Sequence, residues 1–117
     1  MTDLPKKITL CKVSAIKDPG SLGINVESVG GILEVFLVRK GNTVYGYQNH
    51  CPHTGVNLDW MPDQFLDPTE SFIQCATHGA IFRIEDGYCL RGPCAGECLQ
   101  KLDLLIERDE VIFLLGS

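Results

Sequence analysis

Two short motifs, each with one cysteine and one histidine, constrain the folding of this 117-residue chain more than any other feature. Cys51 and His53 flank a single proline, whereas Cys75 and His78 are separated by two residues. Twenty-one residues lie between the motifs, so a fold that joins the four side chains must bring two loops together. Two thiolates and two imidazoles suit a four-ligand metal site, either structural zinc or a [2Fe–2S] cluster with mixed ligands.

The sequence around the motifs predicts short β-strands. Runs rich in β-branched and aromatic residues end at turns of Gly, Pro, Asn or Asp, of which Asp86-Gly87 is the strongest. One helical turn is expected near residues 14–18. The expected strands comprise residues 8–13, 31–39, 43–47, 71–75, 80–84, 88–90, 101–107 and 111–115. This pattern predicts an all-β fold, either a sandwich or a barrel-like structure.

A single domain spanning residues 1–117 is expected, because the chain has no internal repeat and no linker. The first strands and the last two form a base, in which alternation turns Leu102, Leu104 and Ile106 inward. Residues 48–98 form a loop-rich subdomain that holds the metal. The aromatic residues expected to pack this subdomain are Trp60, Phe65 and Phe72.

Composition and charge exclude several kinds of partner. The formal net charge is −5 and no cluster of Lys or Arg is present, so nucleic-acid binding has no electrostatic basis. No apolar run is long enough to span a bilayer and no signal-peptide pattern is visible, so we expect a cytoplasmic protein that does not bind membranes.

Cysteines in the cytoplasm stay reduced, which favours metal ligation over disulfides for the motif cysteines. Four further cysteines lie outside the motifs, and we expect them to be reduced side chains packed in the core. A disulfide or a second metal site between Cys94 and Cys98 remains an alternative. These four residues are Cys11, Cys89, Cys94 and Cys98.

The sequence resembles Rieske-type [2Fe–2S] proteins, above all the small soluble Rieske ferredoxins. The matching segments are residues 49–55 (NHCPHTG), residues 75–82 (CATHGAIF), Gly87 and Gly92-Pro93. A structural zinc site would not explain the glycines and the proline of these segments. The resemblance implies three stacked antiparallel β-sheets, with the cluster at the tip of a smaller subdomain and the Gly92-Pro93 loop covering it.

The resemblance also implies the ligand set. Cys51 and Cys75 would hold one iron of the [2Fe–2S] cluster, and His53 and His78 would hold the other. Two ferric ions, two sulfides and two thiolates sum to zero charge when the histidines are neutral. An electron is added to a neutral cluster more easily than to one with four thiolates, so histidine ligation raises the reduction potential.

Other positions predict a potential at the low end of the Rieske range. High-potential Rieske proteins carry a serine and a tyrosine, two and four residues after the second ligand histidine, whose hydroxyls donate hydrogen bonds to sulfur. Ala80 and Phe82 occupy these positions here. Val56 and Thr77 replace the two cysteines that form a disulfide in those proteins. We therefore expect a potential nearer to about −150 mV than to about +300 mV.

The resemblance implies a one-electron carrier between a reductase and an oxygenase or another oxidoreductase. We assign no catalytic residue and expect no catalysis by the chain alone. The alternative is a redox or structural small subunit of a larger oxidoreductase, such as an assimilatory nitrite reductase, although many such subunits lack the cluster ligands. A terminal oxygenase would need a further site with two histidines and a carboxylate. Only His50 is left for it, and we expect His50 at the surface.

Overall fold

The computed structural model of the chain describes residues 6–28, 31–49, 64–75, 79–92 and 95–115. In these ranges its only helix is η1 (Val13–Ala15), a 3-10 turn that is shorter than the expected helical turn and begins one residue earlier. No helix in the same ranges is long and apolar enough to cross a membrane. The strands are β1 (Lys6–Lys12), β2 (Gly20–Ser28), β3 (Gly31–Lys40), β4 (Thr43–Gln48), β5 (Phe72–Gln74), β6 (Ile81–Arg83), β7 (Cys89–Arg91), β8 (Leu104–Glu107) and β9 (Glu110–Leu115).

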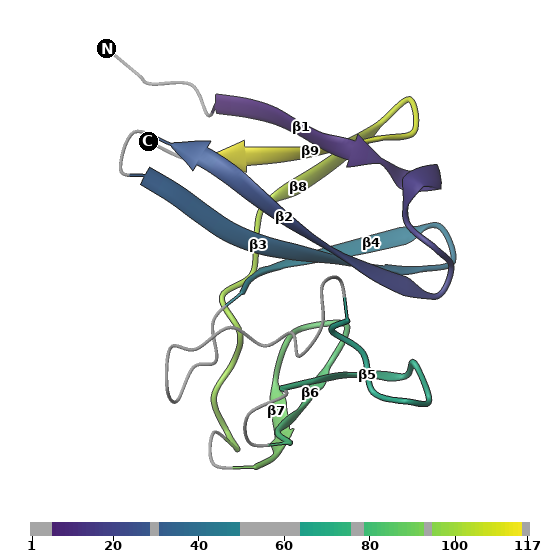
Figure 1. Cartoon of the computed structure of the whole chain (residues 1–117), viewed down its shortest axis with the longest axis vertical. Helices are drawn as coiled ribbons and strands as arrows, with labels where there is room; N and C mark the ends of the chain where they lie inside the picture. Colours follow the sequence, from purple (N-terminus) through teal and green to yellow (C-terminus); the bar gives the residue numbers. More distant parts are fainter. Residues whose placement is uncertain (1–5, 29–30, 50–63, 76–78, 93–94, 116–117) are drawn as a thin grey trace.

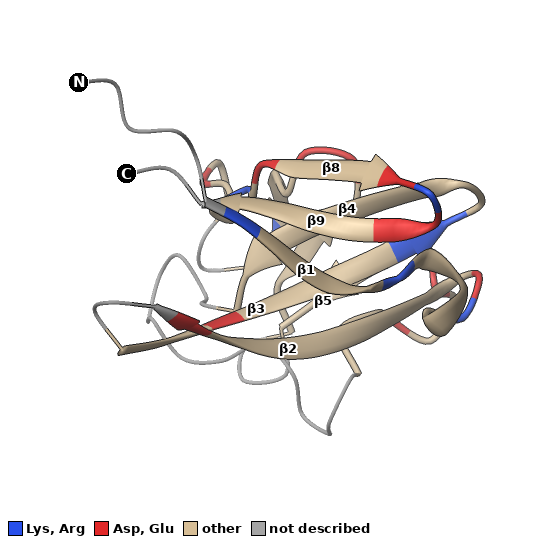
Figure 2. Cartoon of the chain, turned by 90° about the horizontal axis from the view of Figure 1, so that it is seen from above, with Lys and Arg blue, Asp and Glu red and all other residues tan. Residues whose placement is uncertain are grey.

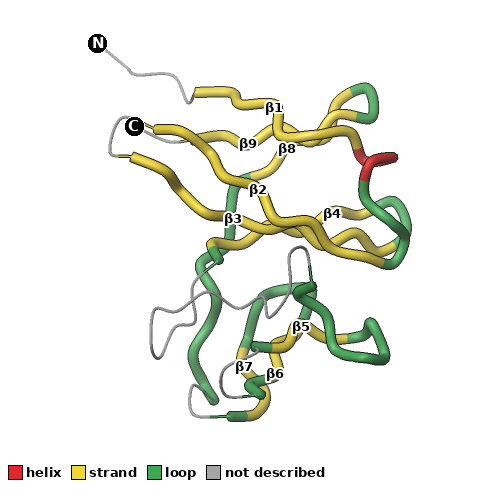
Figure 3. Tube along the Cα trace, viewed as in Figure 1, coloured by secondary structure: helices red, strands yellow, loops and turns green. Residues whose placement is uncertain are grey.

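These strands form three antiparallel sheets of three strands each, in the orders β1–β9–β8, β2–β3–β4 and β5–β6–β7. Figure 1 shows the first two sheets stacked at one end of the molecule and the third sheet at the other end. The strands of the third sheet are only three residues long, and loops make up much of the region around it (Figure 3). The expected all-β fold with three stacked antiparallel sheets is confirmed.

Strand β2 was not predicted from the sequence, although it makes the longest pairing in the structure, with nine residue pairs to β3. Gly20 and Gly23 lower the strand propensity of this segment. Its apolar residues nevertheless alternate with polar ones at Leu22, Ile24 and Val26, which is the pattern of a half-buried strand. For this segment, the alternation of apolar and polar residues therefore predicts the strand better than the glycine content does.

The two larger sheets share an apolar core. Leu37 from β3 and Val111 from β9 are fully buried in one cluster, and Val35 and Phe113 are buried in another. Full burial of such a side chain contributes about 1.5–3 kcal/mol to stability. These two sheets, β1–β9–β8 and β2–β3–β4, form the base of the molecule. The base therefore has a core of its own, to which no residue of strands β5, β6 or β7 contributes.

The third sheet, β5–β6–β7, is called the small sheet. A cluster that contains the aromatic residues Phe36, Tyr47 and Phe65 joins it to the base. The rings of Phe36 in β3 and Phe65 stack with centroids 4.3 Å apart and an interplanar angle of 3°. The hydroxyl of Tyr47 in β4 donates a hydrogen bond to the carbonyl oxygen of Ile84 at 2.5 Å. The expected packing role of Phe65 is confirmed, whereas Trp60 lies outside the described residues.

Two expected core residues are exposed instead. Phe72 is 37% exposed because the next residue of β5, Ile73, points into the core. Ile106 is 41% exposed, since β8 begins only at Leu104 and lies at the edge of its sheet. The alternation predicted for residues 101–107 is therefore correct at Leu102, which is buried, and wrong at Ile106.

Candidate metal centre

The second motif begins where β5 ends, in a loop that is closed by two backbone hydrogen bonds. The N–H of Cys75 donates to the carbonyl oxygen of Ala80 at 2.8 Å, and the N–H of Gly79 donates to that of Cys75 at 2.9 Å. Gly79 has a φ of +66°, a conformation that favours glycine. These bonds bracket residues 76–78, which lie outside the described residues.

Cys75 is fully buried in the aromatic cluster that joins the small sheet to the base. A buried thiolate is costly when its charge is uncompensated, and a bound metal ion compensates it. The buried position of Cys75 therefore fits a metal ligand, because the surrounding side chains exclude water from its sulfur.

The expected covering loop starts against the second motif. Gly92 has a φ of +111°, and a Cβ atom there would lie 2.8 Å from both the Cα and the Cβ of Ala80. Only glycine allows the two backbones to approach this closely. The N–H of Ala95 donates to the carbonyl oxygen of Gly92 at 3.1 Å. The Gly92 end of the loop thus lies beside the loop that carries Cys75.

The segment with the first motif is anchored at both of its described ends. The N–H of Asn49 donates to the carbonyl oxygen of Glu34 at 2.9 Å, and Asn49 is buried. At the other end, Phe65 accepts a hydrogen bond from the N–H of Gln74 at 3.0 Å. Gln74 directly precedes Cys75, so the segment returns to the strand that ends in the second motif.

Three of the four predicted ligands, Cys51, His53 and His78, lie outside the described residues. Among the residues that are described, no group of three or more His, Cys, Asp or Glu side chains could hold a metal ion. The four-ligand set therefore stays a prediction, with Cys75 as its described member.

The two positions that bear on the potential are both described. Ala80 and Phe82 are fully buried in the same cluster as Cys75. Neither side chain carries a hydroxyl group, so neither can donate a hydrogen bond to sulfur. Val56 and Thr77, the positions of the missing disulfide, lie outside the described residues.

The other cysteines occupy different environments. Cys89 is buried as expected, and its Sγ donates to the carbonyl oxygen of Arg91 at 3.2 Å. Cys11 is partly buried, and burial together with the charge of Asp109 raises the pKa of its thiol. Cys98 is exposed, so the expectation that it packs in the core is wrong. Cys94 lies outside the described residues, and its pairing with Cys98 remains untested.

The hairpin of the small sheet turns at Asp86 and Gly87, as the sequence predicted. The guanidinium of Arg83 donates to the carboxylate of Asp86, with Nε at 2.9 Å from Oδ1. This bond, supported by the N–H of Tyr88, lowers the pKa of Asp86 to about 2. The turn is therefore held by a carboxylate that stays ionised over most of the acid range.

A second turn precedes β5 and is stabilised by Asp67. Its Oδ1 accepts hydrogen bonds from the N–H groups of Ser71 and Phe72, both at 3.1 Å, and its Oδ2 accepts one from Thr69 at 2.7 Å. Burial acts to raise the pKa of Asp67, but these hydrogen bonds outweigh it, and the pKa lies below its usual value.

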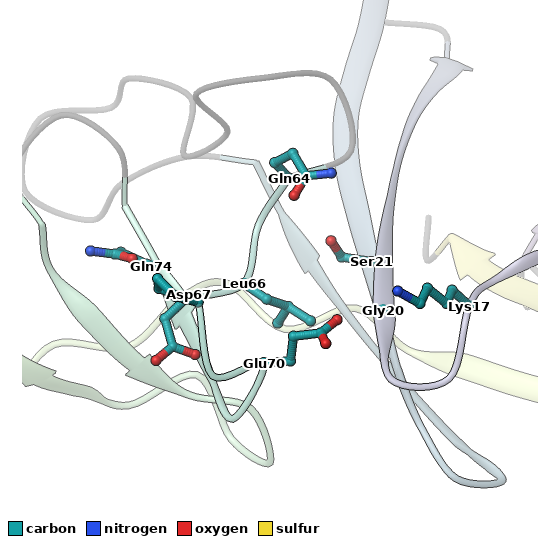
Figure 4. A pocket seen from close by; sticks show the side chains of 9 residues that line it. Lys17, Gly20, Ser21, Gln64, Leu66, Asp67, Glu70 and Gln74 are labelled. Atoms are coloured by element: carbon teal, nitrogen blue, oxygen red, sulfur yellow. The ribbon is translucent and has the colours of Figure 1, made fainter.

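A hollow of about 520 Å³ lies between the start of β2 and the segment that leads into β5 (Figure 4). Lys17 borders it on one side, and Asp67 and Glu70 on the other. Its described lining residues carry no thiol and no imidazole. This hollow therefore does not contribute to the candidate metal centre.

Comparison with known proteins gives a family match over most of the chain. The sequence profile of the Rieske [2Fe-2S] domain matches residues 6–105. A search of curated proteins gives no match.

Several solved structures have the same fold. The terminal oxygenase of carbazole 1,9a-dioxygenase from Novosphingobium sp. KA1 is 18% identical with a TM-score of 0.78, over 97% of this chain. The chain spans only 31% of that oxygenase. A Sphingomonas yanoikuyae B1 ferredoxin is 23% identical with a TM-score of 0.75, over 95% of this chain and 100% of the ferredoxin.

A third similar structure is a complex of reduced oxygenase and oxidised ferredoxin in carbazole 1,9a-dioxygenase. Its matched chain is 20% identical with a TM-score of 0.72, and the match covers 95% of this chain and 94% of that one. At these identities the likeness concerns the fold.

Proposed function

The chain belongs to the Rieske [2Fe–2S] domain family, and from this premise we propose that it is a one-electron carrier. Its cofactor is a Rieske-type [2Fe–2S] cluster, as the family match implies. The observation that carries the proposal is this match over residues 6–105, on a fold that covers the whole of a similar ferredoxin. When bound, the cluster takes up and releases one electron at a time.

We assign Cys51 and Cys75 to one iron, and His53 and His78 to the other. The buried thiol of Cys75 supports this assignment, as does the closed loop between Cys75 and Ala80. The close packing of Gly92 on Ala80 also supports this assignment, because the expected covering loop begins at Gly92. We further propose that residues 1–117 form one domain and that residues 48–98 form its cluster-binding subdomain.

The partners in this proposal are a reductase that donates the electron and an oxygenase or another oxidoreductase that accepts it. The similar structure of an oxygenase–ferredoxin complex supports a protein acceptor of this kind. We further propose that this exchange takes place in the cytoplasm.

The residues around the second motif keep the reduction potential of the carrier low. Buried apolar side chains at Ala80 and Phe82 surround the second motif and offer no hydroxyl donor. Without such donors the reduced, more negative form is stabilised less, and the potential stays low. Because Cys75 is buried, water does not reach its sulfur atom.

The proposal is tested by absorption and EPR spectra of the purified protein, as isolated and after reduction with dithionite. We expect a brown protein whose reduced form gives the EPR signal of mixed nitrogen and sulfur ligation, with two irons per chain. Colourless protein that retains zinc would contradict the proposal.

A further inference from the structure

The small sheet carries an apolar hollow on its exposed face. Phe72 from β5, Ile81 from β6 and Leu90 from β7 line a space of about 320 Å³, which Asp67 and Arg91 border. Phe72 and Leu90 are 37% and 44% exposed. Three strands thus contribute one apolar side chain each to a single patch, which distinguishes it from isolated exposed residues such as Ile106.

The strand register explains why these side chains face outward. In the pairing of β5 with β6, Ile73 lies opposite Phe82, and both are fully buried. Their neighbours Phe72 and Ile81 therefore point to the opposite face of the sheet. Among the residues that the structure describes, none from the two larger sheets lines the hollow, so the described part of the base does not cover it.

The hollow adjoins the candidate metal centre. Ile81 directly follows Ala80, the residue that closes the second motif's loop. Arg91 directly precedes Gly92, whose backbone packs against Ala80. A protein that docked in the hollow would therefore sit beside the loops that we expect to hold the cluster.

The charge of the chain is distributed unevenly between its two parts. Residues 48–98 contain seven acidic and two basic side chains, a net charge of −5, and the remaining residues contain eight of each, a net charge of zero. In the two larger sheets, acidic and basic residues are intermixed (Figure 2). The whole net charge therefore belongs to the segment that carries the hollow and the metal motifs.

We propose that this hollow is a docking site for an apolar side chain on a basic protein surface, that of a redox partner. The negative segment would attract the basic surface and orient it during encounter. The apolar anchor would then supply affinity that is independent of salt. This inference rests on the proposed function and adds to it the face that binds the partner and the chemistry of that partner.

Ferric cytochrome c, a small basic haem protein, serves as the probe. Oxidised holoprotein and ferric cytochrome c exchange no electron, so isothermal titration calorimetry at low ionic strength measures binding alone. We expect Leu90→Ser to weaken binding at least about fivefold, because truncating a side chain that anchors an interface costs more than about 1 kcal/mol. The matched control is Ile32→Ser, which alters an aliphatic side chain of the base that is 67% exposed. It should leave the dissociation constant unchanged.

A charge variant gives an effect of opposite sign. Arg91 borders the hollow and would repel a basic partner, so Arg91→Gln should tighten binding about twofold at low salt. Lys7→Gln removes an equal charge from β1, at the far end of the molecule (Figure 1). Both charge variants are therefore also titrated at 0.1 M salt, where screening over about 10 Å should make this control silent, whereas Arg91 borders the hollow and should keep part of its effect. Equal effects of Arg91→Gln and Lys7→Gln would show non-specific attraction and overturn the proposal.

Two further results would overturn the docking site. One is an unchanged dissociation constant for Leu90→Ser in protein that retains its cluster spectrum. The other is sedimentation showing that wild type self-associates and that Leu90→Ser is monomeric, since the hollow would then be covered by a second copy. Electron transfer is scored separately: wild type is reduced with dithionite, freed of excess dithionite by anaerobic desalting, and then mixed with ferric cytochrome c, so that the reduced cluster is the only electron donor. Failure to produce ferrous haem would count against the carrier function, whereas normal transfer with unchanged Leu90→Ser binding would count only against the docking site.

Discussion

The base and the small sheet of this protein are stabilised in different ways. The base has strands of up to ten residues and two apolar clusters between its sheets. The small sheet has three-residue strands, and its buried apolar side chains share one cluster with Phe36 and Tyr47 of the base, while Asp67 and Asp86 hold its turns. We therefore expect the base to persist without the cluster, and the small sheet, which adjoins the proposed ligand loops, to lose order when the cluster is lost.

Loss of a cluster ligand should produce the largest difference between the two regions. Cys75→Ala removes one of the proposed thiolate ligands, so we expect almost complete loss of iron and of visible absorption. Hydrogen exchange should then accelerate in residues 71–92, while β2 and β3 remain protected. His50→Ala, which alters a histidine outside the ligand set, is the control. Equal acceleration in both regions would show that the base also depends on the cluster.

The aromatic link between the regions should have the next largest effect. Phe65 is fully buried and stacks on Phe36, so Phe65→Ala should cost about 3–5 kcal/mol of unfolding free energy. Phe72→Ala deletes the same ring from an exposed position and should cost less than about 1 kcal/mol. Chemical denaturation of the holoprotein measures both values. Similar losses for the two variants would contradict a link formed by Phe65.

A hydroxyl next to the cluster should raise its potential. Phe82→Tyr places a hydroxyl among the buried residues around Cys75. A hydrogen bond to sulfur that is stronger by about 1.5 kcal/mol in the reduced state corresponds to about 60 mV for one electron. Phe113→Tyr, in the core of the base, is the control and should leave the potential unchanged. A potential that does not move in Phe82→Tyr would place this side chain away from the sulfurs.

The smallest effect concerns the exposed turn of the small sheet. The folded-state pKa of Asp86 lies at about 2, below its ordinary value, because Arg83 donates hydrogen bonds to the carboxylate. The stabilisation is therefore complete above the ordinary pKa of an aspartate and is lost as the pH falls through about 2. Arg83→Gln should raise the titration midpoint of Asp86, as measured by carboxyl NMR. Lys40→Gln, which removes the partner of Glu85, should leave that midpoint nearly unchanged.

The sequence predicted much of the fold, because local signals decide turns and strand type. Asp86-Gly87 marked a hairpin that the structure contains. The sequence did not reveal that Ile73 rather than Phe72 faces the core, since two adjacent apolar residues leave the phase of a strand undetermined.

At the candidate metal centre, the sequence singled out Cys75, Ala80 and Gly92 by resemblance. The reason that glycine is needed at position 92 became visible only in the structure, where its backbone packs on Ala80. The apolar hollow was also not predicted, because it needs one side chain from each of three successive strands, Phe72, Ile81 and Leu90, to face the same side of the sheet. Contacts of this kind depend on tertiary register, which the local pattern does not encode.

An EPR-monitored redox titration of the purified protein tests the central claim most directly. A cluster held by two cysteines and two histidines, without hydroxyl donors at Ala80 and Phe82, should titrate as a single one-electron centre. Its midpoint potential at neutral pH should lie below about 0 mV and toward about −150 mV. A midpoint well above 0 mV, or the absence of any signal from mixed nitrogen and sulfur ligation, would contradict the account.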